Sequence, residues 1–496
     1  MLRIAIILVL FSLTMAKINE SVIIIGAGAS GYSAAVRLMS RNIDDIVILE
    51  AEDRIGGRIN SIPFSDGYID LGAQWVHGQD GNIVYKMVHK HFDLGTTPFN
   101  ERSLTFVFSN GTKPDQELFT NISQINHDIY TGIEEAKNFS GSFGEMFLET
   151  LREVTTNDSF PVFKDLDPKI IEIMKEDAER NINGYCALKS WFDMSAELSA
   201  AEAKIYGNLY NTWKKQGYKT VFDFISRKLP KPSEYIDIES KVHLNKKVTN
   251  IKYNASDVNS KVLVTCADGT SYEATYVIFT ASLGVLKKYH ETLFTPALPE
   301  NNILAIKTMG FGAAGKIFLE FDEPFWTKEE NEFLAYELLW LDADKDEAKA
   351  TNREWMLGIS AFFMVDEFPN MLEVYIAGPK IDQFEASSDE KIINDCMWAL
   401  EKFLGKSLIK PKAMTRSKWL SNDNFLGTYS YPSMDAEKAG VYHEHLAESI
   451  YNRKNEPILI FAGEATDGMY PGTVQGAVQS GIDAANQVCK YCRNAP

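Results

Sequence analysis

Three glycines and one acidic residue near the N-terminus have the types and the spacing of a dinucleotide-binding turn. Gly26, Gly28 and Gly31 form a G-x-G-x-x-G motif after one apolar run, and Glu50 follows a second apolar run. Glycines at this spacing allow a tight bend, close approach of backbone to a pyrophosphate, and close packing of a helix on a strand. The start of that helix would direct free N–H groups at the anion, and the acid would reach a ribose hydroxyl. We therefore expect nucleotide contacts at Gly26, Gly28, Ala29, Ser30, Gly31 and Glu50.

A second glycine-rich turn follows Glu50 with no room for a helix between them. It reads Arg54-Ile55-Gly56-Gly57-Arg58. Adjacent glycines let the backbone pass close to a ligand, and two arginines suit a bidentate hold on phosphate. Alone, the turn is typical of a solvated surface loop. Its place directly after Glu50 favours a phosphate-binding element that uses Arg54, Gly57 and Arg58.

Taken together, the two turns resemble those of the flavin-dependent amine oxidases, whose second phosphate-binding element has this Arg-x-Gly-Gly-Arg form. The resemblance covers nearly the whole chain after residue 16, and it is closest to the polyamine oxidases that act on spermine or N-acetylpolyamines. It implies that the cofactor is FAD and not NAD. It also implies cofactor contacts at Gly72, Ala73, Gln74, Trp75, Val248, Trp419, Gly463, Glu464, Thr473 and Val474.

The resemblance implies catalytic roles for four side chains and a mode of cofactor attachment. Lys316 opens a strand and would ordinarily be solvated, but the family's lysine in this G-K-I-F-L motif holds a water against flavin N5. His77, otherwise a structural histidine, matches a polar residue at the mouth of the substrate tunnel, and Tyr429 matches an aromatic residue beside the substrate. Thr473 stands where monoamine oxidases carry a second tyrosine, so a complete aromatic cage is in question. Thr428 replaces the flavin-linked cysteine of covalent monoamine oxidases, so FAD should be non-covalent.

The activity implied is oxidation of a polyamine by hydride transfer to flavin N5, which gives an aldehyde, a shorter amine and hydrogen peroxide. The implied partners are therefore a small cationic amine and O2. Two alternatives remain at this point. An L-amino-acid oxidase of the same fold would need an arginine in the cavity for the substrate carboxylate, and Arg180 and Arg353 are candidates. A flavoprotein retained only for binding would have no need to keep Gly26, Lys316 and Glu464 together.

The elements that must position these residues are predicted from their periodicity. Residues 21–25, 46–49, 246–251 and 457–461 are expected strands, and 261–265 with 272–280 an expected hairpin. Ile170–Ala178 and Ala200–Trp213 have the apolar spacing of helices. A helix from Thr473 should direct its N-terminus at the flavin.

The fold class expected is α/β, α+β overall, in which a Rossmann-like FAD-binding domain is interleaved with a mixed sheet-plus-helices substrate domain. We assign residues 17–95, 241–295 and 411–496 to the first domain, and residues 96–240 and 296–410 to the second.

The overall charge limits the classes of partner. Fifty lysines and arginines against 68 aspartates and glutamates give a net charge of −18. So acidic a chain does not favour nucleic acid or anionic membranes, and it would attract cationic ligands, although solubility alone also accounts for it. The sequence leaves the oligomeric state open, with a monomer favoured.

The first 16 residues have the pattern of a signal peptide, because Arg3 precedes an apolar run too short to span a bilayer. Secretion and glycosylation are therefore expected. Sequons begin at Asn19, Asn110, Asn121, Asn138, Asn157 and Asn254. Of five cysteines, Cys489 and Cys492 form a C-x-x-C that could close a short disulfide, and the others are expected to be buried.

Overall fold

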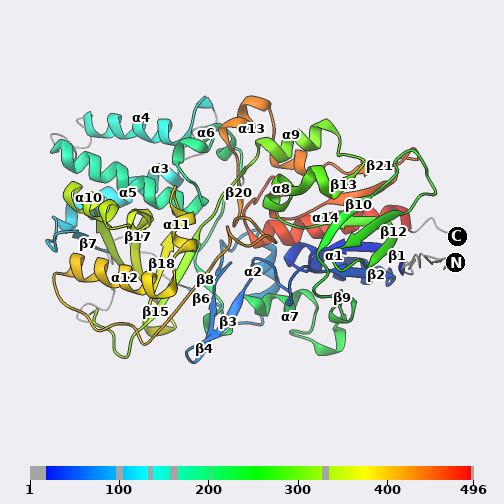
Figure 1. Ribbon diagram of the computed structural model, residues 1–496, viewed down its shortest axis with the longest axis horizontal. Helices are drawn as coiled ribbons and strands as arrows, with labels where there is room; N and C mark the ends of the chain where they lie inside the picture. Colours follow the sequence, from blue (N-terminus) through cyan, green and yellow to red (C-terminus); the bar gives the residue numbers. More distant parts are fainter. Residues whose placement is uncertain are drawn as a thin grey trace, which may run out of the picture.

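The computed structural model describes residues 18–96, 104–131, 138–156, 163, 166–202, 204–326 and 335–492. The predicted signal peptide and the sequon at Asn157 lie outside these residues, as does the side chain of Cys492. Two large sheets organise the chain, one at each end of the molecule, and both described chain ends lie at the end that holds the larger sheet (Figure 1).

The larger sheet has nine strands drawn from three separate stretches of the chain. Parallel pairing runs through its centre, where β1 lies between β12 and β2, and β22 extends the pairing of β12. Its strands are β1 (Ile18–Ile25), β2 (Ile46–Leu49), β9 (Val242–His243), β10 (Val248–Lys252), β11 (Val262–Cys266), β12 (Ser271–Phe279), β13 (Phe294–Thr295), β21 (Ile450–Tyr451) and β22 (Pro457–Phe461). The predicted hairpin is confirmed as the antiparallel pair β11 and β12.

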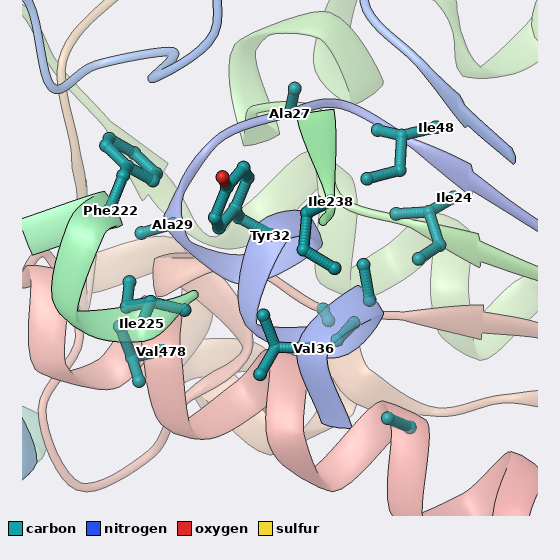
Figure 2. Close-up of a cluster of buried hydrophobic side chains, with 14 of the residues drawn as sticks. Ile24, Ala27, Ala29, Tyr32, Val36, Ile48, Phe222, Ile225, Ile238 and Val478 are labelled. Carbon is teal, nitrogen blue, oxygen red and sulfur yellow. The ribbon is translucent and has the colours of Figure 1, made fainter. Parts of the chain in front are cut away.

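Helix α1 (Ala29–Met39) lies against α14 (Val474–Cys492) beneath this sheet. The side chains of Tyr32 and Val36 on α1 pack in one buried cluster with Phe222 of α7 (Val221–Ile225) and Val478 of α14 (Figure 2). The continuous burial of Val22–Ile25 in β1 and of Ile46–Leu49 in β2 agrees with their unbroken runs of β-branched and aliphatic residues, as expected for a sheet covered on both faces.

The smaller of the two sheets has six strands in the order β19-β15-β18-β17-β16-β7. Helix α12 (Asp389–Leu404) packs on one face, while α4 (Phe143–Thr156) and α5 (Pro168–Cys186) pack on the other (Figure 1). Its strands are β7 (Leu104–Phe108), β15 (Gly315–Glu320), β16 (Ala335–Leu339), β17 (Ile359–Val365), β18 (Phe368–Ile376) and β19 (Ala413–Arg416).

Short strands and further helices connect the two sheets. The small sheets comprise β3 (Ser61–Phe64) with β4 (Gly67–Asp70), β14 (Gly310–Phe311) with β20 (Ser430–Tyr431), and β5 (Trp75–Val76), β8 (Asn211–Thr212) and β6 (Gly95–Thr96). The remaining α-helices are α2 (Ile83–Val88), α3 (Gln116–Thr131), α6 (Ala196–Ser199), α8 (Leu283–Leu293), α9 (Glu300–Thr308), α10 (Asp342–Ala350), α11 (Ile381–Ala386) and α13 (Met434–Ala439). Within the described chain no helix is long and apolar enough to cross a membrane.

Two sequence expectations require correction. Residues 411–416 were assigned with the FAD-binding segments, but β19 pairs with β15 in the six-stranded sheet, so the third segment begins after Arg416. The predicted helix Ala200–Trp213 is also wrong, because α6 ends at Ser199 and β8 begins at Asn211. Asn211 instead uses its side-chain amide to donate to the Asn208 and Val76 carbonyls, which are bonds that compete with a helix. The helix expected at Ile170–Ala178 is confirmed within α5.

Candidate active site

One cavity of about 940 Å³ extends from the glycine turn after β1 to the six-stranded sheet. Of the residues predicted to contact FAD or to be catalytic, only Gly31 and Arg54 do not line it. Those that do are Gly26, Gly28, Ala29, Ser30, Glu50, Gly57, Arg58, Gly72, Ala73, Gln74, Trp75, His77, Val248, Lys316, Trp419, Tyr429, Gly463, Glu464, Thr473 and Val474.

The two glycine turns lie side by side at one end of the cavity. Gly28 and Gly56 form a parallel bridge, and the Gly56 N–H donates to the Ala27 carbonyl at 2.9 Å. Gly26 has a φ of +103°, which favours glycine, and the backbone left bare at Gly28 and Gly57 forms the wall. A Cβ on Gly31 would lie 2.0 Å from the Gly26 carbonyl oxygen, so this glycine permits helix–strand packing and does not face the cavity.

The start of α1 is open to an anion. No side chain caps it and its first turn carries no acid, so its free N–H groups and positive dipole end are available. Glu50, at the end of β2 and only 6% exposed, accepts from the Ala27 and Glu52 N–H groups at 2.7 and 2.8 Å. The free N–H groups of α1 and the bare glycine wall fit the pyrophosphate of FAD, and the Glu50 carboxylate fits its ribose.

The two arginines of the second turn have different roles. Arg54 lies outside the cavity lining, where it donates to the carbonyls of Gly57 and Ile59 and pairs with Glu52 at 2.9 Å. It therefore holds the turn in shape. Arg58 lines the cavity and pairs with Glu464 at 2.7 Å.

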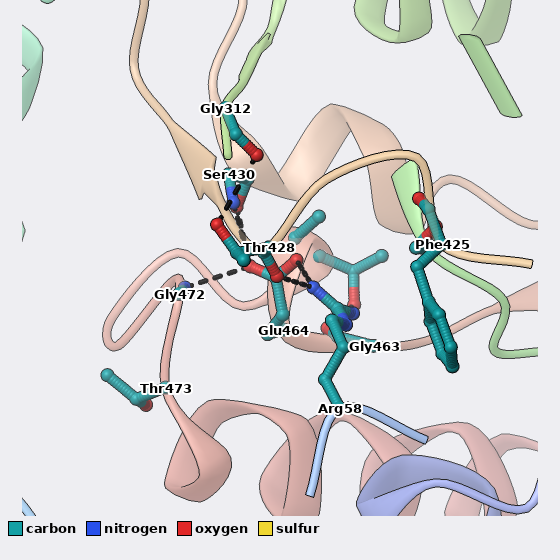
Figure 3. A network of polar contacts seen from close by, with 12 residues as sticks. Arg58, Gly312, Phe425, Thr428, Ser430, Gly463, Glu464, Gly472 and Thr473 are labelled. Carbon is teal, nitrogen blue, oxygen red and sulfur yellow. Dashed lines mark hydrogen bonds and ion pairs between the residues drawn. The ribbon is translucent and has the colours of Figure 1, made fainter. Parts of the chain in front are cut away.

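The Arg58–Glu464 pair joins this turn to the segment after β22 (Figure 3). The other carboxylate oxygen of Glu464 accepts from the Ser430 hydroxyl at 2.7 Å and from the Gly472 N–H at 2.9 Å. Burial raises the pKa of Glu464, but the Arg58 charge and these hydrogen bonds outweigh it and hold the pKa below its usual value. The carboxylate thus stays charged and ties together three walls of the cavity.

Lys316 is buried and not solvated. It is 6% exposed, and its ammonium donates to the Asp70 carbonyl at 3.1 Å and to the Gln74 side-chain oxygen. The Nζ atom lies 5.3 Å from the centre of the Trp75 ring, which favours the cationic form. Burial lowers the pKa of Lys316, and the nearby carboxylates of Glu373 and Asp70 oppose that shift.

His77 is held as a neutral ring. Its Nδ1 lies 2.8 Å from the Leu209 carbonyl, which can only accept, so Nδ1 carries the proton and Nε2 is the acceptor. Burial lowers the pKa of His77, and the Lys316 charge adds to the shift.

Tyr429 and Thr473 both line the cavity, but their hydroxyl groups bond to the protein. The Tyr429 hydroxyl lies 3.1 and 3.0 Å from the carbonyls of Gly184 and Tyr185 near the end of α5. Thr473 donates to the Tyr470 carbonyl and accepts from the Gly476 N–H at 3.1 Å, so it caps the start of α14. Thr473 thus caps a helix and also lines the cavity.

The far end of the cavity is formed by aromatic and acidic side chains that the sequence did not single out. Tyr375 stacks on Trp75 with ring centres 5.7 Å apart, and Glu202 lines the same end with its pKa raised to about 8 by burial. The available signal was the alternation of polar and apolar residues in β18, which places Glu373 and Tyr375 on one face. Other lining residues at this end are Tyr130, Tyr185, Tyr210 and Glu373.

Neither candidate carboxylate-binding arginine reaches the cavity. Arg180 pairs with Asp177 at 3.1 Å and Arg353 with Asp395 at 3.1 Å, both away from the lining. Among the residues the structure describes, Arg58 is the only arginine of the lining, and Glu464 neutralises it. Within the same residues, no group of three His, Cys, Asp or Glu side chains is arranged to hold a metal.

Comparisons with known proteins agree with this geometry. The family model described as flavin containing amine oxidoreductase matches residues 29–489. The peroxisomal N(1)-acetyl-spermine/spermidine oxidase of Bos taurus is 28% identical over 94% of this chain and 94% of its own length. Polyamine oxidase 1 of Zea mays is 27% identical over 96% of this chain and 93% of its own. A redesigned putrescine oxidase structure has the same fold, with a TM-score of 0.65 at 17% identity over 95% of this chain and 99% of that one.

Proposed function

The chain belongs to the flavin-containing amine oxidoreductases and is an FAD-dependent amine oxidase of the polyamine oxidase type; we propose that its substrates are spermine, spermidine or their N-acetyl forms. The reaction proposed consumes the amine, O2 and water, and it yields an aldehyde, a shorter amine and hydrogen peroxide. The alternatives are an L-amino-acid oxidase and a non-catalytic flavoprotein.

The observation that carries the proposal is the chemistry of the far end of the cavity. Glu202 supplies a carboxyl group, and the rings of Trp75 and Tyr375 supply faces that attract cations. Among the described residues, the only arginine that lines the cavity is Arg58, and Glu464 already pairs with it. The far end therefore has no arginine to bind an amino-acid carboxylate. The net charge of −18 also favours the approach of a polycation.

The chain's own residues would hold FAD at the glycine turns, through Glu50 and the start of α1, and beside Lys316 at the other end. When bound, FAD supplies the redox chemistry by accepting a hydride from the carbon next to the amine nitrogen. Lys316, as a buried ammonium, would hold a water and move a proton between that water and the cavity. Neutral His77 would accept a hydrogen bond from the substrate through Nε2. The aromatic rings exclude water and orient the amine.

Peroxide release tests the substrate class. We expect kcat/KM for spermine, spermidine or N-acetylspermine to exceed that for any common L-amino acid by at least about a hundredfold, because a bound carboxylate would find no arginine among the described residues at the far end of the cavity and would lie beside acidic side chains. Higher kcat/KM for an amino acid would support the amino-acid oxidase, and no peroxide from any amine would support the binding protein.

Non-covalent attachment of FAD is also proposed, since Thr428 offers a hydroxyl and no thiol. That hydroxyl accepts from the Ala314 N–H at 3.1 Å. Acid precipitation should leave the yellow chromophore in the supernatant. Colour that remains in the pellet would contradict the proposal.

Secretion completes the proposal for this chain. Its support is the pattern of the first 16 residues and the exposed position of three sequon asparagines, Asn110, Asn138 and Asn254. An exposed asparagine in a loop can carry a glycan without disturbing the core.

A further inference from the structure

Glu373 is a buried acid that faces Lys316 from the neighbouring strand. It is 3% exposed, and β15 and β18 pair so that Lys316 lies opposite Tyr375 and Phe318 opposite Glu373. Lys316 and Glu373 are therefore diagonal neighbours on one face of the sheet, with Nζ and Oε1 3.5 Å apart. A charged pair this deeply buried is costly unless its hydrogen bonds are arranged well.

Gln74 connects the pair. Its amide nitrogen donates to Glu373 Oε2 at 2.9 Å, and its oxygen accepts from Lys316 and, at 3.2 Å, from the Tyr375 hydroxyl. Because only the amide nitrogen can donate to the carboxylate, Glu373 fixes which way Gln74 points and so which atom meets Lys316.

The third donor of Lys316 and the Oε1 atom of Glu373 face each other at ion-pair distance. An ammonium has three donors, and two are used by the Asp70 carbonyl and Gln74. Glu373 Oε1 has no hydrogen-bond partner among the described residues, although it lies within ion-pair distance of Nζ. The ion pair therefore restrains the ammonium at the cavity wall, beside the Asp70 carbonyl and Gln74.

The surrounding groups make Glu373 the main counter-charge. Burial lowers the pKa of Lys316, and Glu373 opposes this more than Asp70 does. The Asp70 carboxylate accepts from Ser61 and the Tyr218 N–H, and burial raises its pKa to about 6. Neutral His77 adds no charge, and the charge of Asp366 raises the pKa of Glu373.

We propose that Glu373 is a positioning residue that keeps Lys316 protonated and holds its ammonium in place at the cavity wall. The proposal rests on the proposed function, in which Lys316 acts as an ammonium. Without the Glu373 charge, burial would lower the pKa of Lys316 further, so Lys316 would lose its proton at a lower pH.

The experiment compares Glu373→Gln, Lys316→Met, their double variant and the control Glu320→Gln in the FAD-loaded enzyme. Glu320 is a buried acid of β15, the strand that carries Lys316. It pairs with Lys412 at 3.0 Å and lies outside the cavity lining. We expect Glu373→Gln to lower kcat about tenfold or more and to move the alkaline limb of the rate–pH profile down by at least about one pH unit. Lys316→Met should lower the rate by about two to four orders of magnitude, and the double variant should match it.

A second readout does not depend on activity. In the FAD-free protein, Glu373→Gln should lower the free energy of unfolding relative to the parent protein, and most strongly at neutral pH. This difference should shrink as the pH rises toward the ordinary lysine pKa. The sign follows because the lone buried Lys316 binds its proton more weakly folded than unfolded. In the Lys316→Met background, Glu373→Gln should produce no such pH-dependent deficit.

The outcomes separate the two proposals. Parental turnover by Lys316→Met would refute the role of Lys316 in the proposed function. A slow Lys316→Met together with an unmoved alkaline limb in Glu373→Gln, or with multiplicative effects in the double variant, would overturn the inference alone. The same shift of the limb in Glu320→Gln would also overturn it.

Discussion

At the residue scale, Glu202 should titrate in the range where the enzyme works. Burial raises its pKa to about 8, and its Oε1 has no hydrogen-bond partner among the described residues, with His443 Nε2 4.0 Å away. A bound ammonium would favour the carboxylate and lower that pKa. Glu202 should therefore release a proton when a cationic amine binds near neutral pH.

The prediction is that KM for spermine falls as pH rises from 6 through about 8, while kcat changes less. Glu202→Gln should raise KM about tenfold or more and flatten this dependence. Glu197→Gln, on the nearby helix α6 and outside the lining, is the matched control. An unchanged KM profile in Glu202→Gln would show that this acid does not meet the substrate.

The residues recognised from sequence were those whose motif is local. Lys316 and Glu464 could be recognised because each lies within a short sequence motif of adjacent residues. Glu373 could not, because it lies 57 residues from Lys316 in the chain and their contact depends on the register between β15 and β18. The placement of Arg54 also depends on three-dimensional detail, since its partners are carbonyls of its own turn.

At the element scale, the crossing of α1 and α14 requires a glycine. A Cβ at Gly481 would lie 2.0 Å from the Ser30 carbonyl oxygen, and Ser480 beside it accepts from the Gly463 N–H at 3.0 Å. The crossing thus ties the start of α1 to the segment after β22. Both border the cavity.

Gly481→Ala should lower the free energy of unfolding by about 1–3 kcal/mol, as overpacking does, and should weaken FAD retention. Denaturant unfolding and the ratio of bound flavin to protein measure these effects. Gly184→Ala in α5, where no atom lies within 4 Å of the added Cβ, should instead be neutral or stabilising by up to about 1 kcal/mol. Equal stability of the two variants would mean that α1 and α14 do not pack as closely as described.

Elements built from local pattern were predictable, and those held by distant partners were not. The run from β1 through α1 to β2 carries its signals in sequence, as does the β11–β12 hairpin. Residues 200–213 have helical spacing of apolar residues, but side-chain bonds from Asn208 and Asn211 and pairing of β8 with β5 and β6 determine their structure.

At the scale of the whole molecule, the sequence indicated two interleaved sheets but missed the position of β19. Strand β19 precedes Trp419, a cavity residue, by only a few positions, so no change in composition marks the boundary. The acidic character of the chain was readable from counts alone, whereas the acidic end of the cavity required the fold.

Export can be tested on the intact chain. We expect material from conditioned medium to begin near Lys17 and to lose mass on treatment with an N-glycosidase, because Asn110, Asn138 and Asn254 are exposed. Replacing each of these by Gln should remove glycan mass stepwise, while replacing Asn211, which is buried and outside any sequon, should leave glycan mass unchanged. Protein retained in cells with Met1 intact and no glycan would contradict secretion.

Anaerobic mixing shows whether this cavity brings a polyamine to bound FAD for oxidation. The FAD-loaded protein is mixed without oxygen with spermine, spermidine, N-acetylspermine or an L-amino acid, and the visible flavin absorption is followed. We expect rapid loss of that absorption with at least one polyamine, no comparable loss with amino acids, and recovery when air is admitted. Absorption that persists with every polyamine, or that is lost faster with an amino acid, would contradict this expectation.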